Sequence, residues 1–308
     1  MRIACLQFAP RLGEIYPNIE KANKILDNTE ELKTQSSTAP LWLVLPEMAF
    51  SGYNFHSLEH ITPLLEPTAG GPTTEWAKET AKRYNAYVTV GYPEKSIPDP
   101  PKPGEDPRAG NYNSMVTVSP GGQVIAHYRK RFLYYTDETW ASEGDGTNPP
   151  SGFFAGDLDG VTVAMGICMD INPYKFTAPW TDYEFANHVI ESRAQLVILS
   201  MAWLTRLSPQ ELTELPLRPD NDTFTYWIER FLPLQLAGGG PIFIVLANRC
   251  GVERSACYAG TSAVISFRNG KGCIYNILGK YDEQCMVVDL KQAPKYEIQT
   301  NGLTPGGY

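Results

Sequence analysis

Three ionisable side chains follow apolar segments that are predicted to be β-strands. The segments cover residues 41–46, 124–129 and 161–167, and the side chains are Glu47, Lys130 and Cys168. Because strands of an open sheet bring their ends to a common edge, we expect the three to share one crevice. There the carboxylate can take the thiol proton and return it to a leaving amine, while the ammonium and backbone N–H groups stabilise an oxyanion. Together they predict amide hydrolysis by a thiol nucleophile; Glu47 and Lys130 alone would fit a structural ion pair.

The segment before Cys168 has the composition of a buried strand. Residues 161–167 are small, β-branched or apolar, and Pro173 prevents the strand from continuing past the cysteine. A cysteine at this position can expose its thiol at a sheet edge, with the next backbone N–H facing a developing negative charge. The alternative is an inert core cysteine, since free cysteine is among the most buried residue types.

The rest of the chain is predicted to position these side chains in an α/β fold. Helical spacing covers residues 18–33, 73–85, 183–193 and 223–236, and strands alternate with these helices, with hairpins mixed in. Burying both apolar faces requires a mixed sheet, or a pair of sheets, covered by helices. With no internal repeat and no linker, we expect one domain over residues 1–290 and an irregular tail over residues 291–308.

Composition narrows the class of protein. The net charge of −8, with no block of Lys or Arg, argues against nucleic-acid binding. The longest apolar runs, such as residues 241–247, are far too short to span a membrane. Six scattered cysteines without a Cys-x-x-Cys pair predict free thiols in a reducing, cytoplasmic setting. No cofactor is expected.

One competing motif is a zinc site. His56, Glu59 and His60 have the His-x-x-Glu-His spacing that places two imidazoles on one face of a helix. Pro63 limits such a helix to little more than one turn. A metalloprotease therefore remains a remote alternative.

Three motifs resemble those of the nitrilase superfamily of carbon–nitrogen hydrolases. They are Leu45-Pro46-Glu47 with Ser51-Gly52-Tyr53, Tyr128-Arg129-Lys130-Arg131-Phe132-Leu133, and Gly166-Ile167-Cys168-Met169-Asp170. The resemblance covers the chain to about residue 290. It implies a four-layer α-β-β-α sandwich and hydrolysis through a thioester, with Glu47 as general base, Lys130 as stabiliser of the intermediate and Cys168 as nucleophile.

The resemblance also implies a second, supporting glutamate, which falls on Glu138, with Glu143 as the alternative. Two departures concern the surroundings of the site: Phe132 stands where the superfamily usually has histidine, and the segment after Cys168 lacks the arginines that clamp a substrate carboxylate in carbamoyl-amino-acid hydrolases. Ile171 and Asn172 cannot form such a bidentate clamp. A small amino-acid-like substrate with its own carboxylate at that place is therefore disfavoured.

Within the superfamily, residues 134–138 and 168–176 are similar to the fungal protein N-terminal asparagine/glutamine amidohydrolases. This likeness implies deamidation of the N-terminal Asn or Gln of a peptide or protein, the first step of an N-degron pathway. Met169, Asn172 and Trp203 follow strand ends at or beside Cys168 and are predicted to contact substrate. Omega-amidases, carbamoylases and nitrilases share the mechanism and remain alternatives. The resemblance leaves a homodimer open, because many relatives associate through helices that flank the nucleophile.

Overall fold

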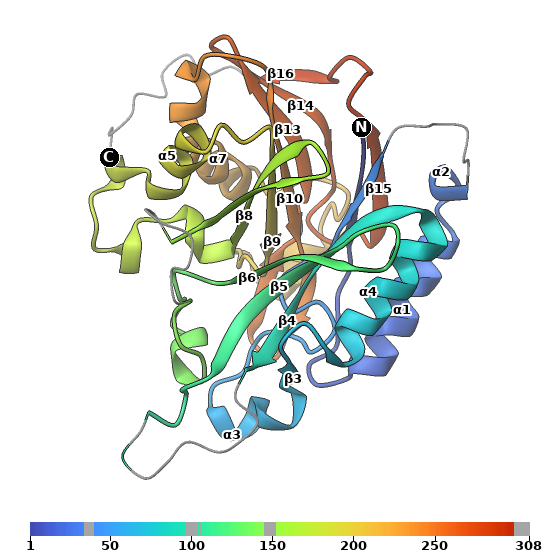
Figure 1. Cartoon of the computed structure of the whole chain (residues 1–308), viewed down its shortest axis with the longest axis vertical. Coiled ribbons are helices and arrows are strands. Elements are labelled where there is room, and N and C mark those ends of the chain that lie inside the picture. Colours follow the sequence, from blue (N-terminus) through green and yellow to red (C-terminus); the bar gives the residue numbers. More distant parts are fainter. Residues whose placement is uncertain (34–39, 97–103, 105, 145–151, 299–308) are drawn as a thin grey trace.

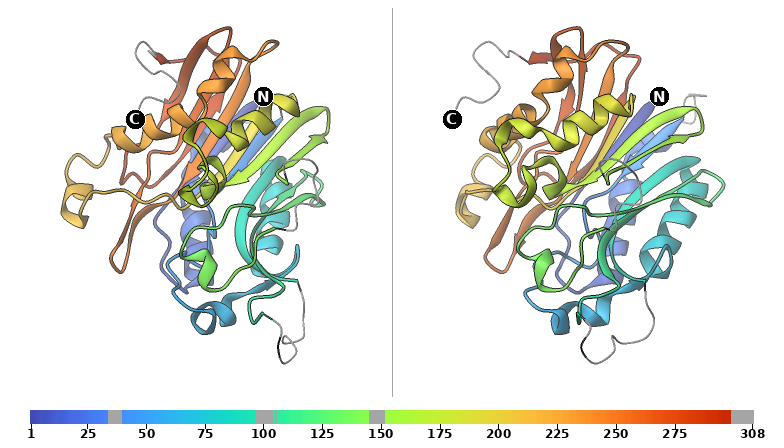
Figure 2. Two further views of the ribbon diagram at one scale, coloured as in Figure 1. Left: turned by 90° about the vertical axis from the view of Figure 1, so that its left-hand side faces the viewer. Right: turned by 60° about the vertical axis from the view of Figure 1, so that its left-hand side comes forward.

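The computed structural model describes residues 1–33, 40–96, 104, 106–144 and 152–298 of the 308-residue chain. In these residues the strands form two seven-stranded sheets and one two-stranded ribbon. The sheets stack face to face, and helices cover their outer faces (Figure 1, Figure 2).

The first sheet is built mainly from the N-terminal half of the chain. Its hydrogen-bonded order is β15-β1-β2-β4-β5-β6, and β3 pairs with β4. The strands are β1 (Arg2–Gln7), β2 (Leu41–Val44), β3 (Glu66–Pro67), β4 (Ala86–Lys95), β5 (Asn111–Val118), β6 (Val124–Arg129) and β15 (Gln284–Asp289). Since β5 is antiparallel to both β4 and β6, and β4 is parallel to β2, the carboxyl ends of β2 and β6 point the same way.

The second sheet has the order β16-β14-β13-β10-β9-β8-β7. Its strands are β7 (Phe154–Leu158), β8 (Val161–Ile167), β9 (Leu196–Met201), β10 (Ile242–Asn248), β13 (Ala263–Arg268), β14 (Lys271–Ile277) and β16 (Tyr296–Ile298). The three central strands β8, β9 and β10 are parallel. The ribbon pairs β11 (Cys250–Glu253) with β12 (Ala256–Ala259).

Two pairs of helices form the outer layers. Helices α1 (Ile15–Asp27) and α4 (Gly71–Tyr84) cover the first sheet, and α5 (Glu184–Glu191) and α7 (Asn221–Arg230) cover the second (Figure 1). The short helices α2 (Glu30–Lys33), α3 (Leu58–Ile61) and α6 (Pro209–Thr213) lie in connections. The predicted four-layer α-β-β-α sandwich is confirmed.

The alternation of side chains along β1 shows how one strand serves two layers. Ile3 and Cys5 belong to the core between the sheets, while Ala4 and Leu6 pack in the core beneath α1 and α4. Both faces of the strand are therefore buried, as the continuous apolar pattern predicts. A hydrogen bond from Ser200 Oγ to the Leu45 carbonyl (2.8 Å) joins the two sheets near the ends of their strands.

The structure changes two sequence-based expectations. The predicted irregular tail contains β16, which pairs with β14, while residues 299–308 lie outside the described part. The three predicted strand ends do not share one sheet edge: β2 and β6 belong to the first sheet and β8 to the second. The sequence pattern could not show this, because it identifies strands but not their partners.

Candidate active site

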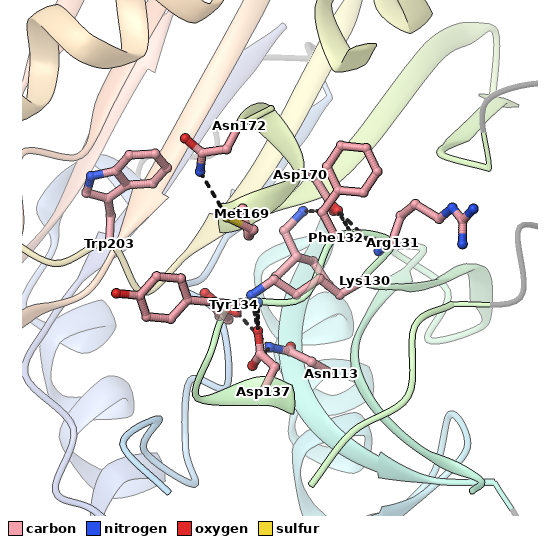
Figure 3. Close-up of polar contacts among 12 residues, drawn as sticks. Asn113, Lys130, Arg131, Phe132, Tyr134, Asp137, Met169, Asp170, Asn172 and Trp203 are labelled. Carbon is pink, nitrogen blue, oxygen red and sulfur yellow. Dashed lines mark hydrogen bonds and ion pairs between the residues drawn. The ribbon is translucent and has the colours of Figure 1, made fainter. Parts of the chain in front are cut away.

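A buried cluster of charges lies at the carboxyl ends of β2 and β6 (Figure 3). The Lys130 ammonium donates one hydrogen bond to Glu47 Oε1 and another to Asp137 Oδ2, each 2.6 Å long. All three side chains are fully buried. Burial alone would lower the pKa of Lys130, but the carboxylates of Asp137 and Glu47 outweigh it and raise that pKa. Lys130 therefore stays charged.

Asn113 joins the two carboxylates from β5. Its Nδ2 donates to Glu47 Oε1 (2.6 Å) and to Asp137 Oδ1 (3.0 Å). The antiparallel pairing of β5 with β6 brings it there, because the Lys130 N–H donates to the Asn113 carbonyl at 2.8 Å. Sequence reasoning missed this residue. The available signal was a polar side chain at the start of a strand that otherwise reads as buried.

Gly91 on β4 allows Glu47 to reach the cluster. A Cβ atom at this glycine would lie 2.9 Å from Glu47 Cα and 2.7 Å from the Met48 nitrogen, closer than side chains tolerate. The Ala49 N–H donates to the Gly91 carbonyl (3.0 Å), so the loop after β2 rests directly on β4. Because Gly91 has no side chain, the backbone at Glu47 can approach β4, and this approach positions the Glu47 carboxylate.

The second carboxylate beside Lys130 is Asp137 and not Glu138, the residue on which the supporting glutamate was predicted to fall. Residues Asp137–Thr139 form a 3₁₀ turn, in which neighbouring side chains point in different directions. Asp137 therefore faces the core, whereas Glu138 is exposed and its carbonyl accepts a hydrogen bond from Arg108.

The alternative, Glu143, does not contact Lys130 either. It accepts a hydrogen bond from the Tyr174 hydroxyl (2.7 Å) and pairs with Arg131 at 3.5 Å. The helical spacing of the buried residues Leu133, Asp137, Trp140 and Ala141 was the sequence signal that favours Asp137.

Cys168 approaches from the second sheet. It begins the 3₁₀ turn Cys168–Ile171 directly after β8, with a left-handed φ of 42°. Such a turn from strand to helix lifts the side chain off the sheet. The residue is 8% exposed, and the backbone N–H of Ala202, which follows β9, donates to the thiol.

The electrostatic setting favours a neutral thiol beside a carboxylate that can accept its proton. Burial, followed by the charge of Glu47, raises the pKa of Cys168 well above its ordinary value, while Lys130 opposes this. Burial also raises the pKa of Glu47, again opposed by Lys130. Among the described residues, Glu47 Oε2 has no hydrogen-bond partner, whereas Oε1 accepts from Lys130 and Asn113. Oε2 is thus available for a proton.

Asp170 ties the nucleophile turn to the lysine segment. Its carboxylate accepts the backbone N–H groups of Ile167 (2.7 Å), Phe132 (2.8 Å) and Arg131 (3.1 Å), and the Tyr128 hydroxyl (2.9 Å). Burial raises the pKa of Asp170 to about 6, although these hydrogen bonds lower it. One buried side chain therefore holds the ends of β6 and β8, from different sheets, in a defined relation.

A cavity of about 730 Å³ adjoins Cys168. Met169, Asn172 and Trp203, the three predicted substrate contacts, all line it, together with Tyr53 and Tyr134. In Figure 3, Met169, Asn172, Trp203 and Tyr134 lie on the same side of Lys130, away from Arg131. The structure thus brings the predicted substrate-binding residues to one space beside the thiol.

Helix α7, distant in sequence, completes one wall of the cavity. The Tyr226 hydroxyl donates to Asn172 Oδ1 at 2.6 Å, and the Tyr226 ring lies 5.3 Å from that of Trp203. Arg230 donates from Nε to the Ile171 carbonyl at 2.7 Å. This wall was not predicted, because residues 221–230 show a helical pattern but no chemical motif.

The cavity has more acidic than basic lining residues. Asp220, Asp222 and Glu229 line it, and Arg206 is the basic residue among the described lining residues. Asp220 caps α7 and accepts hydrogen bonds from the hydroxyls of Thr205 (2.6 Å) and Thr223 (2.8 Å). The acidic wall suits a positively charged part of a ligand.

The arrangement required for zinc does not form. The one-turn helix α3 begins at Leu58, so His56 precedes it, and the His60 ring packs 4.9 Å from that of Phe55. Within residues 1–298, apart from the undescribed gaps, no three metal-ligating side chains gather. No helix in the same residues is long and apolar enough to cross a membrane.

The fold and the site agree with the comparison to known families. The sequence profile of the carbon–nitrogen hydrolases matches residues 2–174, a range that includes Glu47, Lys130 and Cys168. The chain therefore belongs to the carbon–nitrogen hydrolase family.

Within that family the chain is similar to protein N-terminal amidases. It is 30% identical to the protein N-terminal amidase of Schizosaccharomyces pombe, over 95% of this chain and all of that one. The protein N-terminal amidase of Saccharomyces cerevisiae is 31% identical over 68% of this chain and 46% of its own length. The crystal structure of an N-terminal amidase with an Asn-Glu peptide superposes with a TM-score of 0.78 at 23% identity, covering 93% of this chain and 96% of that one.

Proposed function

We propose that this hydrolase converts an N-terminal Asn or Gln of a peptide or protein into Asp or Glu, with release of ammonia. The observation that carries the proposal is the buried charge cluster, in which one Glu47 oxygen has no partner, beside a thiol that lines a cavity. The relatives named as protein N-terminal amidases support the choice of substrate.

The first half of the reaction forms a thioester. Cys168 Sγ attacks the side-chain amide carbon while its proton passes to Glu47 Oε2, so that the buried thiol need not ionise beforehand. Lys130 stabilises the oxyanion of the tetrahedral intermediate. The C–N bond then breaks, Glu47 returns the proton to the leaving nitrogen, and ammonia departs.

The second half hydrolyses the thioester. A water molecule gives one proton to Glu47 and attacks the acyl carbon. When the C–S bond breaks, the proton returns to the sulfur, and the product carries a new carboxylic acid. Asp137 and Asn113 act as positioning residues, because they hold Lys130 and Glu47 through both steps.

The cavity supports a substrate with a free α-ammonium group. Asp222 and Glu229 supply negative charge to its wall. Ile171 is buried and Arg230 is engaged with the Ile171 and Trp180 carbonyls, so neither provides a clamp for a substrate carboxylate. A peptide N-terminus, cationic at one end and without a nearby carboxylate, fits these charges.

The test compares three peptides of one sequence that begins with Asn: free, acetylated at the α-amine, and extended by one residue so that Asn becomes internal. We expect ammonia release from the free peptide and about a hundredfold less from the other two, since in both the Asn residue lacks the α-ammonium group that the acidic wall attracts. The Gln series should follow the same order.

Two cysteine variants make the test specific. Cys168→Ala should abolish ammonia release, whereas Cys273→Ala, at a half-buried free cysteine on β14, should retain it. Equal turnover of free and acetylated peptides would refute the N-terminal specificity and favour an omega-amidase or carbamoylase. Activity in Cys168→Ala would refute the mechanism.

The cellular setting is also part of the proposal. We infer a cytoplasmic enzyme that supplies acidic N-termini to an N-degron pathway. The six cysteines, all free, are consistent with a reducing compartment.

A further inference from the structure

Three aromatic side chains surround one side of the cavity mouth: Tyr134, Tyr135 and Phe176, here called the aromatic rim. Tyr134 and Phe176 line the cavity itself. Tyr135 is 64% exposed and Phe176 is 45% exposed, although both are large and mostly apolar. The ring centroids lie 5.1 Å (Tyr134–Tyr135), 6.1 Å (Tyr135–Phe176) and 6.4 Å (Tyr134–Phe176) apart. They form one patch that a ligand side chain could cover.

The backbone that carries Phe176 is strained. Lys175 and Phe176 have φ angles of 53° and 54°, in the left-handed region that non-glycine residues rarely occupy. Two consecutive residues of this kind, one of them aromatic, are unfavourable unless surrounding contacts hold them. Strain of this kind concentrates at functional sites, and here it presents an aromatic ring to the cavity.

Tyr174 provides the contacts that hold this turn. Its carbonyl accepts the N–H groups of Thr177 (3.0 Å) and Ala178 (3.1 Å), and its ring packs 4.9 Å from that of Phe132. Its hydroxyl donates to Glu143. The backbone turn that carries Phe176 is therefore held before any ligand arrives, which lowers the entropy cost of binding there.

The rim begins close to the reacting groups. The Tyr134 N–H donates to Asp137 Oδ2 (3.0 Å), the same oxygen that accepts from Lys130. An extended chain advances about 3.3–3.6 Å per residue, so the 6.4 Å between the rings of Tyr134 and Phe176 is less than two residues of substrate. With the first residue against Tyr134, the second side chain reaches Phe176 and Tyr135.

We propose that the aromatic rim is a subsite for the second residue of the substrate and selects aromatic and large aliphatic side chains there. The inference rests on the proposed N-terminal deamidation and adds a preference that the reaction itself does not require. The occupant is the substrate chain, because the rim is continuous with the cavity that holds Cys168.

The test measures ammonia release from Asn-Phe-Gly-Gly and Asn-Gly-Gly-Gly. For the wild type we expect kcat/KM to be about tenfold higher with Phe, mainly through KM, because the rim covers part of the added ring. Phe176→Asn, whose new residue tolerates left-handed φ, should reduce the ratio to within twofold by lowering kcat/KM for the Phe peptide. Tyr135→Ser should lower the ratio partway.

Tyr16→Ser is the matched control, because Tyr16 on α1 is 70% exposed and is not among the residues that line the cavity. It should keep the wild-type ratio. Equal turnover of the two peptides by the wild type, or an unchanged ratio in Phe176→Asn, overturns the subsite while deamidation stands. A change in sedimentation of Phe176→Asn with an unchanged ratio would make the rim a contact between copies and also overturn it. Absence of ammonia from both peptides would overturn the deamidation proposal as well.

Discussion

The two sheets contribute to the active site in different ways. The first sheet provides Glu47, Lys130 and Asp137, which are fully buried and compensate one another's charge. The second sheet provides Cys168 on a turn, next to a cavity lined by residues from several loops and α7. The first sheet thus contributes a closed polar core, whereas the second contributes a thiol that borders a cavity.

The difference has a physical reason. Buried charges are tolerated only when each is paired, so the polar cluster needs positions that many surrounding contacts fix. A neutral thiol needs no partner and can lie at the boundary with a cavity. Substitutions in the charge cluster of the first sheet should therefore affect folding and chemistry together, whereas those of the thiol and the cavity lining should affect chemistry or binding alone.

The largest effect should come from Lys130→Met. Removal of the ammonium leaves two buried carboxylates without compensation, which should lower the free energy of unfolding by about 3–5 kcal/mol. Activity should also be lost. Cys168→Ala should lower kcat/KM at least about 10⁴-fold yet change the free energy of unfolding by less than about 1 kcal/mol. Urea unfolding and ammonia release on both variants compare the two sides directly.

Lys271→Met is the control for this pair of variants, because Lys271 forms an exposed ion pair with Glu297. It should behave like the wild type in both measurements. A Lys130→Met variant as stable as the wild type would contradict the contrast between the two sheets.

A second test separates Asp137 from its neighbour. Asp137→Asn should lower kcat about 10²–10³-fold, because Lys130 loses one of the two carboxylates that hold its charge and position. Glu138→Gln should leave kcat within twofold, since that side chain is exposed. Steady-state kinetics with one Asn peptide decides between them. The reverse order would restore Glu138 as the supporting carboxylate.

A third test concerns Asp170, which joins the two sheets. Burial raises its pKa to about 6, whereas the unfolded chain has an ordinary value of about 3.9. At a pH between these two pKa values, Asp170 is protonated in the folded state and ionised in the unfolded state. The contribution of Asp170 to the free energy of unfolding therefore falls as pH rises from about 4 to about 6, by about 3 kcal/mol in total.

Asp170→Asn should remove this part of the pH dependence. Urea unfolding of the variant and the wild type at pH 4, 5, 6 and 7 measures it as a difference between the two proteins. Asp157→Asn, at an exposed aspartate of β7, should keep the wild-type slope. If the free energy of unfolding depends on pH in the same way for Asp170→Asn and the wild type, the Asp170 carboxyl does not titrate in this range.

The smallest effect should come from the cavity wall. Tyr226→Phe removes the hydroxyl that orients the Asn172 amide, so KM should rise roughly fivefold, corresponding to about 1 kcal/mol, with little change in kcat. Stability should change less than in Lys130→Met. Tyr84→Phe, which removes a hydrogen bond to Asp27 between α1 and α4, serves as the control with unchanged kinetics. A large fall in kcat would place Tyr226 nearer the chemistry than the cavity wall.

Sequence patterns identified some residues of the active site and missed others. Glu47, Lys130 and Cys168 could be identified because each follows a strand with an evident apolar pattern. Asn113 and Asp137 were missed, because one belongs to a strand and the other to a single 3₁₀ turn whose facing direction depends on what packs against it. A one-residue shift in such a turn exchanges a buried carboxylate for an exposed one.

The sequence by itself determined the elements and the reactive residue types, since apolar periodicity and strand-ending residues act over short distances along the chain. The tertiary structure decided that the thiol and its proton acceptor come from opposing sheets, that Asp170 ties the nucleophile turn to the lysine segment, and that Tyr226 and Phe176 border the same cavity. These relations join residues far apart in the chain. They arise from the packing of two sheets and four helices, which local sequence preferences do not specify.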